Sequence, residues 1–248
     1  MRMDDKMGMG NGDMSDFVRD ILQYEKAFCV DEYHYVESTD DAMADSTDEN
    51  GTQAIVRDSR VIISIPHDTY HVRGQKVKPP EVLTGGIGRY VADRLGCSVI
   101  CNLSNADPNR DAFERSAYKQ RLLGMIDDDT RLVMNLHGLS DVYGVSVDIG
   151  TNPSSGMPFR SLRSAYPILS VFREHLEDGF AGTGYGRPIT LNEPFDAHGD
   201  TVTGFLSERT GMPCVQLEIA RALCDADNPT LLYAVTDAIC AMASAVIE

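Results

Sequence analysis

Two apolar runs of this chain each lead to a histidine, and a third contains a carboxylate. Val61–Ile65 is followed by Pro66 and His67, and the run 132–136 leads directly to His137. The third run begins at Cys214 and carries Glu218 near its end. Such runs are typical of buried strands, and open α/β sheets bind ligands beyond the carboxyl ends of their strands. Two imidazoles and a carboxylate at that edge indicate a metal site with a general base.

Each of these residues has a purely structural alternative. Taken singly, His67 or His137 could equally be a hydrogen-bonded histidine at the end of a core strand. Their shared place at one sheet edge favours metal ligation. His71, four residues after His67, is a competing ligand of lower rank. Glu218 lies among apolar residues, where a carboxylate needs a partner or a role. A salt bridge with Arg221 is the structural alternative, and general-base catalysis is the functional one.

Three arginines could bind a substrate carboxylate through two parallel hydrogen bonds, namely Arg73, Arg110 and Arg221. Arg110 is the best placed, because it lies on a polar loop after the predicted strand 97–103. Residues 84–88 (TGGIG) resemble a phosphate-binding turn, but they follow a proline-rich loop instead of a strand. We therefore interpret these glycines as points of close helix packing.

The elements that must position these residues alternate between strands and helices. Strands are predicted at 60–66, 97–103, 131–136, 145–149, 186–191 and 213–219, and helices at 15–28, 84–95, 112–125, 162–176, 200–210 and 228–246. Residues 67–83 are predicted to form a loop. The alternation predicts an α/β fold in a single domain, with a mostly parallel, mixed central sheet and helices on both faces.

Composition and charge restrict the class of protein. The chain has 248 residues, of which 42% are hydrophobic and 24% charged, as is ordinary for a globular protein. Its net charge of −16 disfavours binding to nucleic acid or to an anionic membrane. Residues 37–50 carry six acidic side chains and no basic one, which indicates a flexible loop. We expect an N-terminal extension over 1–58, with a short helix and this acidic loop, and a catalytic domain over 59–248.

The lengths of the apolar runs, the N-terminus and the cysteines suggest a cellular compartment. No run approaches the roughly 20 apolar residues that cross a membrane. The polar, methionine-rich N-terminus is unlike a secretion signal, so we expect a cytoplasmic protein. The six cysteines form no CxxC pair and are interpreted as small buried hydrophobic residues. The sequence does not indicate an oligomeric state.

The motifs taken together and in order resemble the N-formylglutamate amidohydrolase family, which is related in fold to zinc carboxypeptidases and aspartoacylases. The resemblance covers roughly residues 60–224. The matching pieces, in order, are PH at 66–67, then Arg73, Lys76, Lys78, Glu81, Thr84 and Gly85, DPN at 107–109, YK at 118–119, NLHG at 135–138, DIGT at 148–151, NEPF at 192–195, Thr201 and VQLEI at 215–219.

This resemblance implies one zinc ion per chain, held by His67, Glu81 and His137, with Glu218 as the base that activates water. Glu81 enters only through the resemblance, because its spacing alone favours a carboxylate that stabilises the start of a helix. Carboxypeptidases place the first histidine and the glutamate two residues apart, whereas thirteen residues separate His67 from Glu81 here. The chain therefore resembles a divergent branch of the family.

The resemblance also implies which residues bind the substrate. Asn109 and Arg110 match the loop that orients the substrate and polarises its carbonyl, and Arg73 lies in the preceding motif. Asp148 and Thr151 match a glycine-containing loop near the pocket. The expected partner is a small molecule with a carboxylate.

The function expected from these residues is a zinc-dependent amidohydrolase, which cleaves C–N bonds other than peptide bonds. Its expected substrate is a small acidic N-acyl amino acid such as N-formylglutamate. A metallopeptidase acting on a peptide or γ-glutamyl substrate is one alternative, and a non-catalytic binding protein on the same fold is another. A nucleotide-binding α/β protein is disfavoured by the context of the glycines and by the acidic charge.

Overall fold

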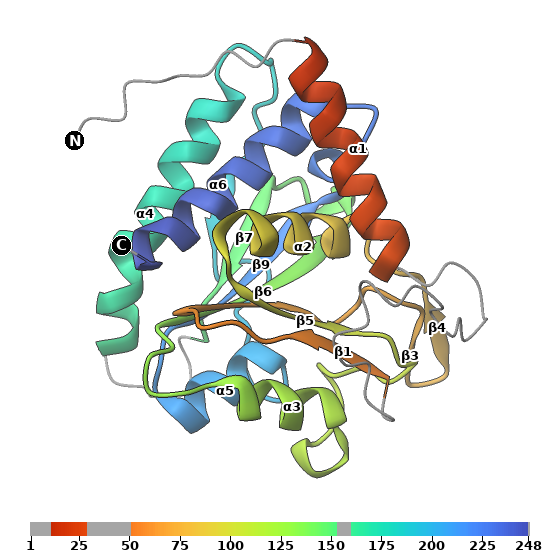
Figure 1. Ribbon diagram of the computed structural model, residues 1–248, viewed down its shortest axis with the longest axis vertical. Coiled ribbons are helices and arrows are strands. Elements are labelled where there is room, and N and C mark those ends of the chain that lie inside the picture. Colours follow the sequence, from red (N-terminus) through yellow and green to blue (C-terminus); the bar gives the residue numbers. More distant parts are fainter. Residues whose placement is uncertain (1–10, 29–50, 153–159, 248) are drawn as a thin grey trace.

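A seven-stranded mixed sheet forms the centre of the computed structural model, which describes residues 11–28, 51–152 and 160–247 (Figure 1). The strand order is β1-β5-β2-β6-β9-β7-β8. Their bounds are β1 (Thr52–Ile55), β2 (Val61–Ile65), β5 (Ser98–Asn102), β6 (Leu132–Leu139), β7 (Val147–Gly150), β8 (Ile189–Leu191) and β9 (Cys214–Ala220). The predicted acidic loop at 37–50 lies outside the described residues.

The centre of this sheet is parallel and its margins are mixed. β5, β2, β6 and β9 run parallel to one another, while β1 is antiparallel to β5 and β7 is antiparallel to β9. β8 then pairs with β7 in parallel. The six predicted strands are all present, and the predicted mostly parallel, mixed α/β sheet is confirmed. β1 was not predicted, and it lies within the expected N-terminal extension.

Helices cover both faces of the sheet (Figure 1). On one face lie α1 (Asn11–Phe28), α2 (Thr84–Leu95), α4 (Arg160–Phe180) and α6 (Pro229–Ile247). On the other lie α3 (Ala117–Met125) and α5 (Val202–Thr210). Short 3₁₀ turns, η1 (Phe113–Arg115), η2 (Asp141–Tyr143) and η4 (Arg221–Leu223), occur in the connections.

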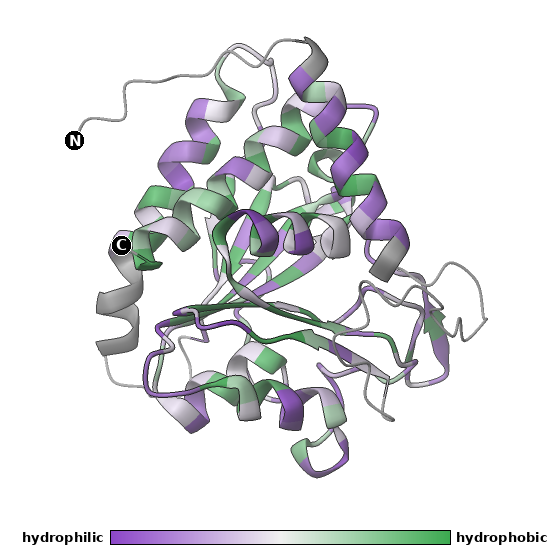
Figure 2. Cartoon of the chain, viewed as in Figure 1, coloured by the Kyte–Doolittle hydropathy of each residue, from purple (hydrophilic) through white to green (hydrophobic). Residues whose placement is uncertain are grey.

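Alternation along the strands divides the core between the two faces. In β2, Val61, Ile63 and Ile65 join the cluster under α2 and α6, whereas Ile62 joins the cluster under α3 and α5. Successive strand residues point to opposite faces, so a strand covered on both sides needs an unbroken apolar run. Figure 2 shows the strands predominantly in the hydrophobic colour. The apolar runs that mark the strands in the sequence follow from this double burial.

After β2 the chain adds β5 on one side of β2, and it then crosses back to add β6 on the other side. β2 connects to β5 through α2 on one face, and β5 connects to β6 through α3 on the opposite face. β6 then lies on the other side of β2 from β5. Such a switch point leaves a crevice outside the carboxyl ends of the two strands, where open α/β sheets bind ligands. His67 follows β2 and His137 lies near the end of β6, at this crevice.

Two segments differ from the sequence prediction. The predicted loop at 67–83 contains a hairpin of β3 (His71–Arg73) and β4 (Lys76–Lys78), which turns at Gly74 with a φ of 65°. The predicted helix 112–125 is divided at Ser116, whose hydroxyl accepts a hydrogen bond from the backbone N–H of Lys119. This side-chain cap begins α3 afresh after η1.

Within the described residues, α6 alone is long and apolar enough by length and composition to cross a membrane. This differs from the expectation that no segment reaches that length. In the structure α6 packs against α4, α2 and α1. Its residues Leu232, Val235, Ile239 and Met242 are fully buried in the core. Burial on more than one side accounts for a helix with so few polar positions.

Candidate metal centre

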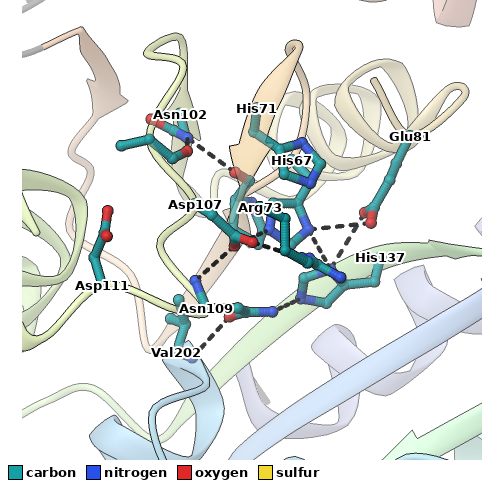
Figure 3. Close-up of polar contacts among 12 residues, drawn as sticks. His67, His71, Arg73, Glu81, Asn102, Asp107, Asn109, Asp111, His137 and Val202 are labelled. Carbon is teal, nitrogen blue, oxygen red and sulfur yellow. Dashed lines mark hydrogen bonds and ion pairs between the residues drawn. The ribbon is translucent and has the colours of Figure 1, made fainter. Parts of the chain in front are cut away.

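Three donor side chains converge at the crevice between β2 and β6 (Figure 3). The Nδ1 atoms of His67 and His137 lie 3.1 Å apart. The Glu81 carboxylate completes the group, with Oε1 3.1 Å from His67 Nδ1 and Oε2 3.2 Å from His137 Nδ1. These three residues could hold a metal ion. The structure thus brings together all three residues that the sequence predicted as ligands.

The spacing and type of these donors fit a small divalent ion. Nitrogen and carboxylate ligands lie about 2.0–2.2 Å from zinc, which puts two ligands of a tetrahedral ion about 3.3–3.4 Å apart. The three observed separations approach that edge length. Two imidazoles and one carboxylate also match a common donor set of catalytic zinc, with the fourth position left for water or substrate.

Backbone contacts fix Glu81 in this group. Its N–H donates to the carbonyl of His67 at 3.0 Å, which joins the segments that carry two of the donors. Its Oε2 accepts a hydrogen bond from the N–H of Gly138 at 2.9 Å. A Cβ on Gly138 would lie 3.0 Å from the Cβ of Glu81, so the glycine permits this close approach. Thirteen intervening residues, folded into the β3–β4 hairpin, return Glu81 to His67.

A buried carboxylate orients His67 from behind. Asp107 Oδ1 lies 2.9 Å from His67 Nε2, and Asp107 Oδ2 accepts a hydrogen bond from Arg73 Nε at 2.6 Å. The N–H of Asn109 donates to Oδ1 at 3.1 Å. A carboxylate on the outer nitrogen of a ligating histidine fixes the tautomer that leaves Nδ1 free for metal. Figure 3 shows Asp107 between His67 and Arg73.

Asn109 links His137 to the start of α5. Its Nδ2 lies 3.3 Å from His137 Nε2, and its Oδ1 accepts a hydrogen bond from the N–H of Val202 at 2.9 Å. Both polar atoms of the Asn109 side-chain amide are therefore in contact with protein groups. This contact places Asn109 beside His137 on the cavity wall, and its predicted role in orienting the substrate stays a prediction.

The electrostatics of the group favour a positive charge at its centre. Burial alone would lower the pKa of His67, but the Glu81 and Asp107 carboxylates outweigh it and raise that pKa to about 9. Burial would raise the pKa of Glu81, but the imidazoles of His67 and His137 hold it well below its usual range. The pKa of Asp107 is lowered, because His67 and Arg73 outweigh its desolvation. Carboxylates that hold a proton on His67 would also stabilise a metal cation.

His71 stacks on the outer face of His67 and remains a competing donor. Their ring centroids lie 4.1 Å apart with the planes at 13°. Burial and the charge of His67 lower the pKa of His71 to about 4. His67, His71 and Asp107 form a second group of potential donors, but in it His67 Nε2 and Asp107 are already hydrogen-bonded to each other.

Glu218 lies beside the donor group on the next strand. It is the register partner of His137 across the parallel β6–β9 pair. Burial raises its pKa to about 7, with the charge of His137 opposing and that of Glu81 adding to the shift. Its Oε1 accepts a hydrogen bond from Gln216 Nε2 at 2.8 Å. A carboxylate with this pKa can both accept and release a proton near neutral pH.

One cavity of about 830 Å³ joins these groups. Its wall includes the three candidate ligands, Glu218 and a set of basic residues, Arg73, Lys78, Arg110 and Arg221. Arg110 is exposed, and among the described residues its guanidinium makes no hydrogen bond or ion pair. It is therefore available to an anionic ligand. Arg73 is held by Asp107 instead.

Two predicted substrate-binding residues lie outside the cavity wall. Asp148 is fully buried in β7, where its carboxylate accepts hydrogen bonds from Thr190 Oγ1 and from the N–H groups of Glu193 and Phe195. Thr151 pairs with the side chain of Asn192. Both residues thus hold the 190–195 segment, part of which lines the cavity.

Sequence reasoning assigned no role to two residues that position this site. In the sequence Asp107 is only part of the DPN motif at 107–109, and its contact with His67 forms only when the chain folds. Lys119 is buried, and its Nζ donates to the carbonyls of Asp111 and Asp200 at 2.7 and 2.5 Å. It joins the loop of Arg110 to the loop that leads into α5. A lysine at a core-facing position of a predicted helix is the signal that could have indicated it.

No protein-family model and no curated protein matches this sequence. Among solved structures, the gene product Atu2144 from Agrobacterium tumefaciens overlaps with a TM-score of 0.53 at 13% identity, over 80% of this chain and 97% of that one. A bacteriophage poly-gamma-glutamate hydrolase overlaps with a TM-score of 0.46 at 15% identity, over 78% and 90%. The N-acetylmuramyl-L-alanine amidase Ami1 from Mycobacterium smegmatis has a TM-score of 0.45 at 12% identity, over 77% and 98%. The similarity to Atu2144 establishes the α/β fold alone, and the resemblance to N-formylglutamate amidohydrolases stays a prediction.

Proposed function

We propose that this protein is a zinc-dependent hydrolase that cleaves the amide bond of a small acidic N-acyl amino acid such as N-formylglutamate. The observation that carries this proposal is the convergence of two imidazole nitrogens and a carboxylate at 3.1–3.2 Å. A second carboxylate lies beside them, on the same cavity wall. This combination supplies both a metal site and a base.

The residues divide the chemistry between them. Zinc at His67, Glu81 and His137 would supply Lewis-acid activation of the carbonyl and of water. Glu218 accepts the proton of the attacking water and returns it to the departing nitrogen. Arg110 pairs with the substrate carboxylate or with the developing oxyanion, because its guanidinium lies on the cavity wall and has no partner among the described residues.

A second candidate substrate is a peptide or a γ-glutamyl oligomer. The observation that favours it is the cavity volume of about 830 Å³. Cavities of about 300–1,000 Å³ take drug-sized ligands, and an N-acyl amino acid would fill only part of this one. The additional basic residues Lys78 and Arg221 on the wall suit a substrate with more than one carboxylate.

A substrate screen distinguishes these proposals. Zinc-loaded protein is assayed for release of free amine from N-formyl and N-acetyl amino acids, acidic and neutral, and from γ-glutamyl oligomers. Turnover of acidic N-acyl amino acids supports the first proposal, and turnover of the oligomers alone supports the second. Zinc binding without turnover of any amide would contradict both and favour a non-catalytic binding protein.

A further inference from the structure

The helix that follows Glu81 begins without a cap of its own. The residue at its N-cap position, Leu83, has a left-handed backbone with a φ of 57° and an apolar side chain that cannot accept a hydrogen bond. Left-handed backbone is unfavourable for leucine, so its surroundings must hold it. Leu83 lies two residues after Glu81, and the hydroxyl of Thr84 donates to the carbonyl of Glu81 at 3.0 Å. The position of Glu81 is thus tied to the start of α2.

A carboxylate from a distant helix supplies the missing cap. Glu25 of α1 accepts a hydrogen bond from the N–H of Leu83 at 2.8 Å through Oε1, and from the N–H of Gly86 at 2.7 Å through Oε2. Both are N–H groups at the start of α2, and a carboxylate at a helix N-terminus is stabilised by the helix dipole. Figure 1 shows α1 alongside α2.

Glycines at the start of α2 allow this approach. A Cβ on Gly86 would lie 2.5 Å from the carbonyl oxygen of Ile21 on α1. A Cβ on Gly85 would lie 2.2 Å from the carboxylate of Asp68, the residue after His67. The start of α2 is therefore where α1 meets the two chain segments that carry His67 and Glu81. These contacts account for the glycines at 85 and 86.

We propose that Glu25 is a positioning residue for the metal site: by capping α2 it holds the Glu81 carboxylate at the His67–His137 pair. This inference rests on the proposed metal chemistry. It gives α1 a role in the site, although α1 lies far from β2 in the sequence and contributes no residue to the cavity wall. Without the Glu25 cap, the strained Leu83 backbone relaxes and Glu81 moves with it.

The test compares the full-length protein with Glu25→Ala and Glu25→Gln, and with Asp20→Ala as the matched control. Asp20 lies on the same helix and is partly exposed, and its replacement by alanine removes the same charge. Zinc affinity is measured by competition with a chromophoric chelator. Amide hydrogen exchange over residues 81–88 is measured on the metal-free proteins, with circular dichroism as the check on folding.

We expect Glu25→Ala to weaken zinc binding about tenfold, as for other changes behind metal ligands. Exchange at residues 83–86 should accelerate, while Asp20→Ala behaves as wild type. If Glu25→Ala fails to fold, the test rests on Glu25→Gln. This variant is milder, because its amide oxygen still accepts one of the two hydrogen bonds. Zinc affinity within about twofold of wild type in a folded Glu25 variant would overturn the inference, because changes behind metal ligands typically cost tenfold or more. If the wild-type protein binds no zinc, that result contradicts the proposed function instead. Amide hydrogen exchange at residues 83–86 then tests only whether Glu25 caps α2.

Discussion

His137 and Glu218 are register partners on the adjacent parallel strands β6 and β9. Register partners in a parallel pair point to the same face, and neighbouring strands lie about 4.8 Å apart. The candidate ligand and the candidate base are therefore held side by side by the backbone of the sheet, without dependence on a loop. A catalytic pair on rigid elements keeps its geometry better than one on loops.

Replacing Glu218 tests its role as the base. Glu218→Gln keeps the shape of the side chain and removes its ability to accept a proton, so turnover should fall about 10²–10⁴-fold. Zinc content should stay at the wild-type value, because Glu218 is not among the donor residues. The exposed Glu177→Gln on α4 serves as control. Turnover near the wild-type rate in Glu218→Gln would show that another group takes the proton.

The raised pKa of Glu218 predicts a pH-dependent cost to stability. Burial raises this pKa from its ordinary value of 4.5 to about 7, so the folded protein disfavours the charged form. The cost is absent below pH 4.5, grows between pH 4.5 and 7, and is complete above pH 7. Chelator-treated Glu218→Gln should therefore be more stable than wild type by about 3 kcal/mol at pH 8 and similar to it at pH 4. Urea denaturation at both pH values measures this, and a difference that does not vary with pH would contradict it.

Asp107 is predicted to tune metal binding through His67. Asp107→Asn keeps the size of the side chain but weakens its hold on His67 Nε2 and Arg73. Zinc affinity should fall about 10–100-fold, as measured by chelator competition. Asp129→Asn, at an exposed position, is the control and should leave the affinity unchanged. Equal affinities in the two variants would exclude this role for Asp107.

We predict that a side chain at position 138 displaces the carboxylate of Glu81. In Gly138→Ala the new Cβ lies 3.0 Å from the Cβ of Glu81, so the carboxylate must shift away from the two histidines. Weaker zinc binding is the expected result. Gly124→Ala in α3 is the matched control, because its Cβ meets nothing within 4 Å. That control should gain about 0.5–1 kcal/mol of stability and keep its zinc affinity. Unchanged affinity in Gly138→Ala would indicate that Glu81 tolerates displacement.

The sequence predicted those parts of the fold that follow from local periodicity. The run 61–65 is apolar except for Ser64 because both faces of the sheet are covered, and such runs indicate that His67, His137 and Glu218 lie near strand ends. The β3–β4 hairpin was missed because three-residue strands with exposed, charged residues such as Lys76 and Lys78 have no apolar pattern. β1 was missed because four residues are too few for a period to appear.

The site was less accessible to sequence reasoning, because its contacts join distant segments. Only the family resemblance indicates Glu81 as a ligand, because nothing in its local spacing shows that a hairpin returns it to His67. Asp107 and Glu25 each act on the site across more than 35 residues of sequence. Asp148 shows the opposite case, where a motif near the cavity in sequence proves to be buried behind its wall.

Metal content measured by elemental analysis tests the central claim most directly. Wild-type protein incubated with zinc and desalted should hold about one ion per chain, the usual content of a site with three protein ligands. His67→Ala and His137→Ala should each hold well below one ion, while His175→Ala, an exposed histidine on α4, should match wild type. Zinc-free wild type, or stoichiometric zinc in His67→Ala and His137→Ala, would contradict the account.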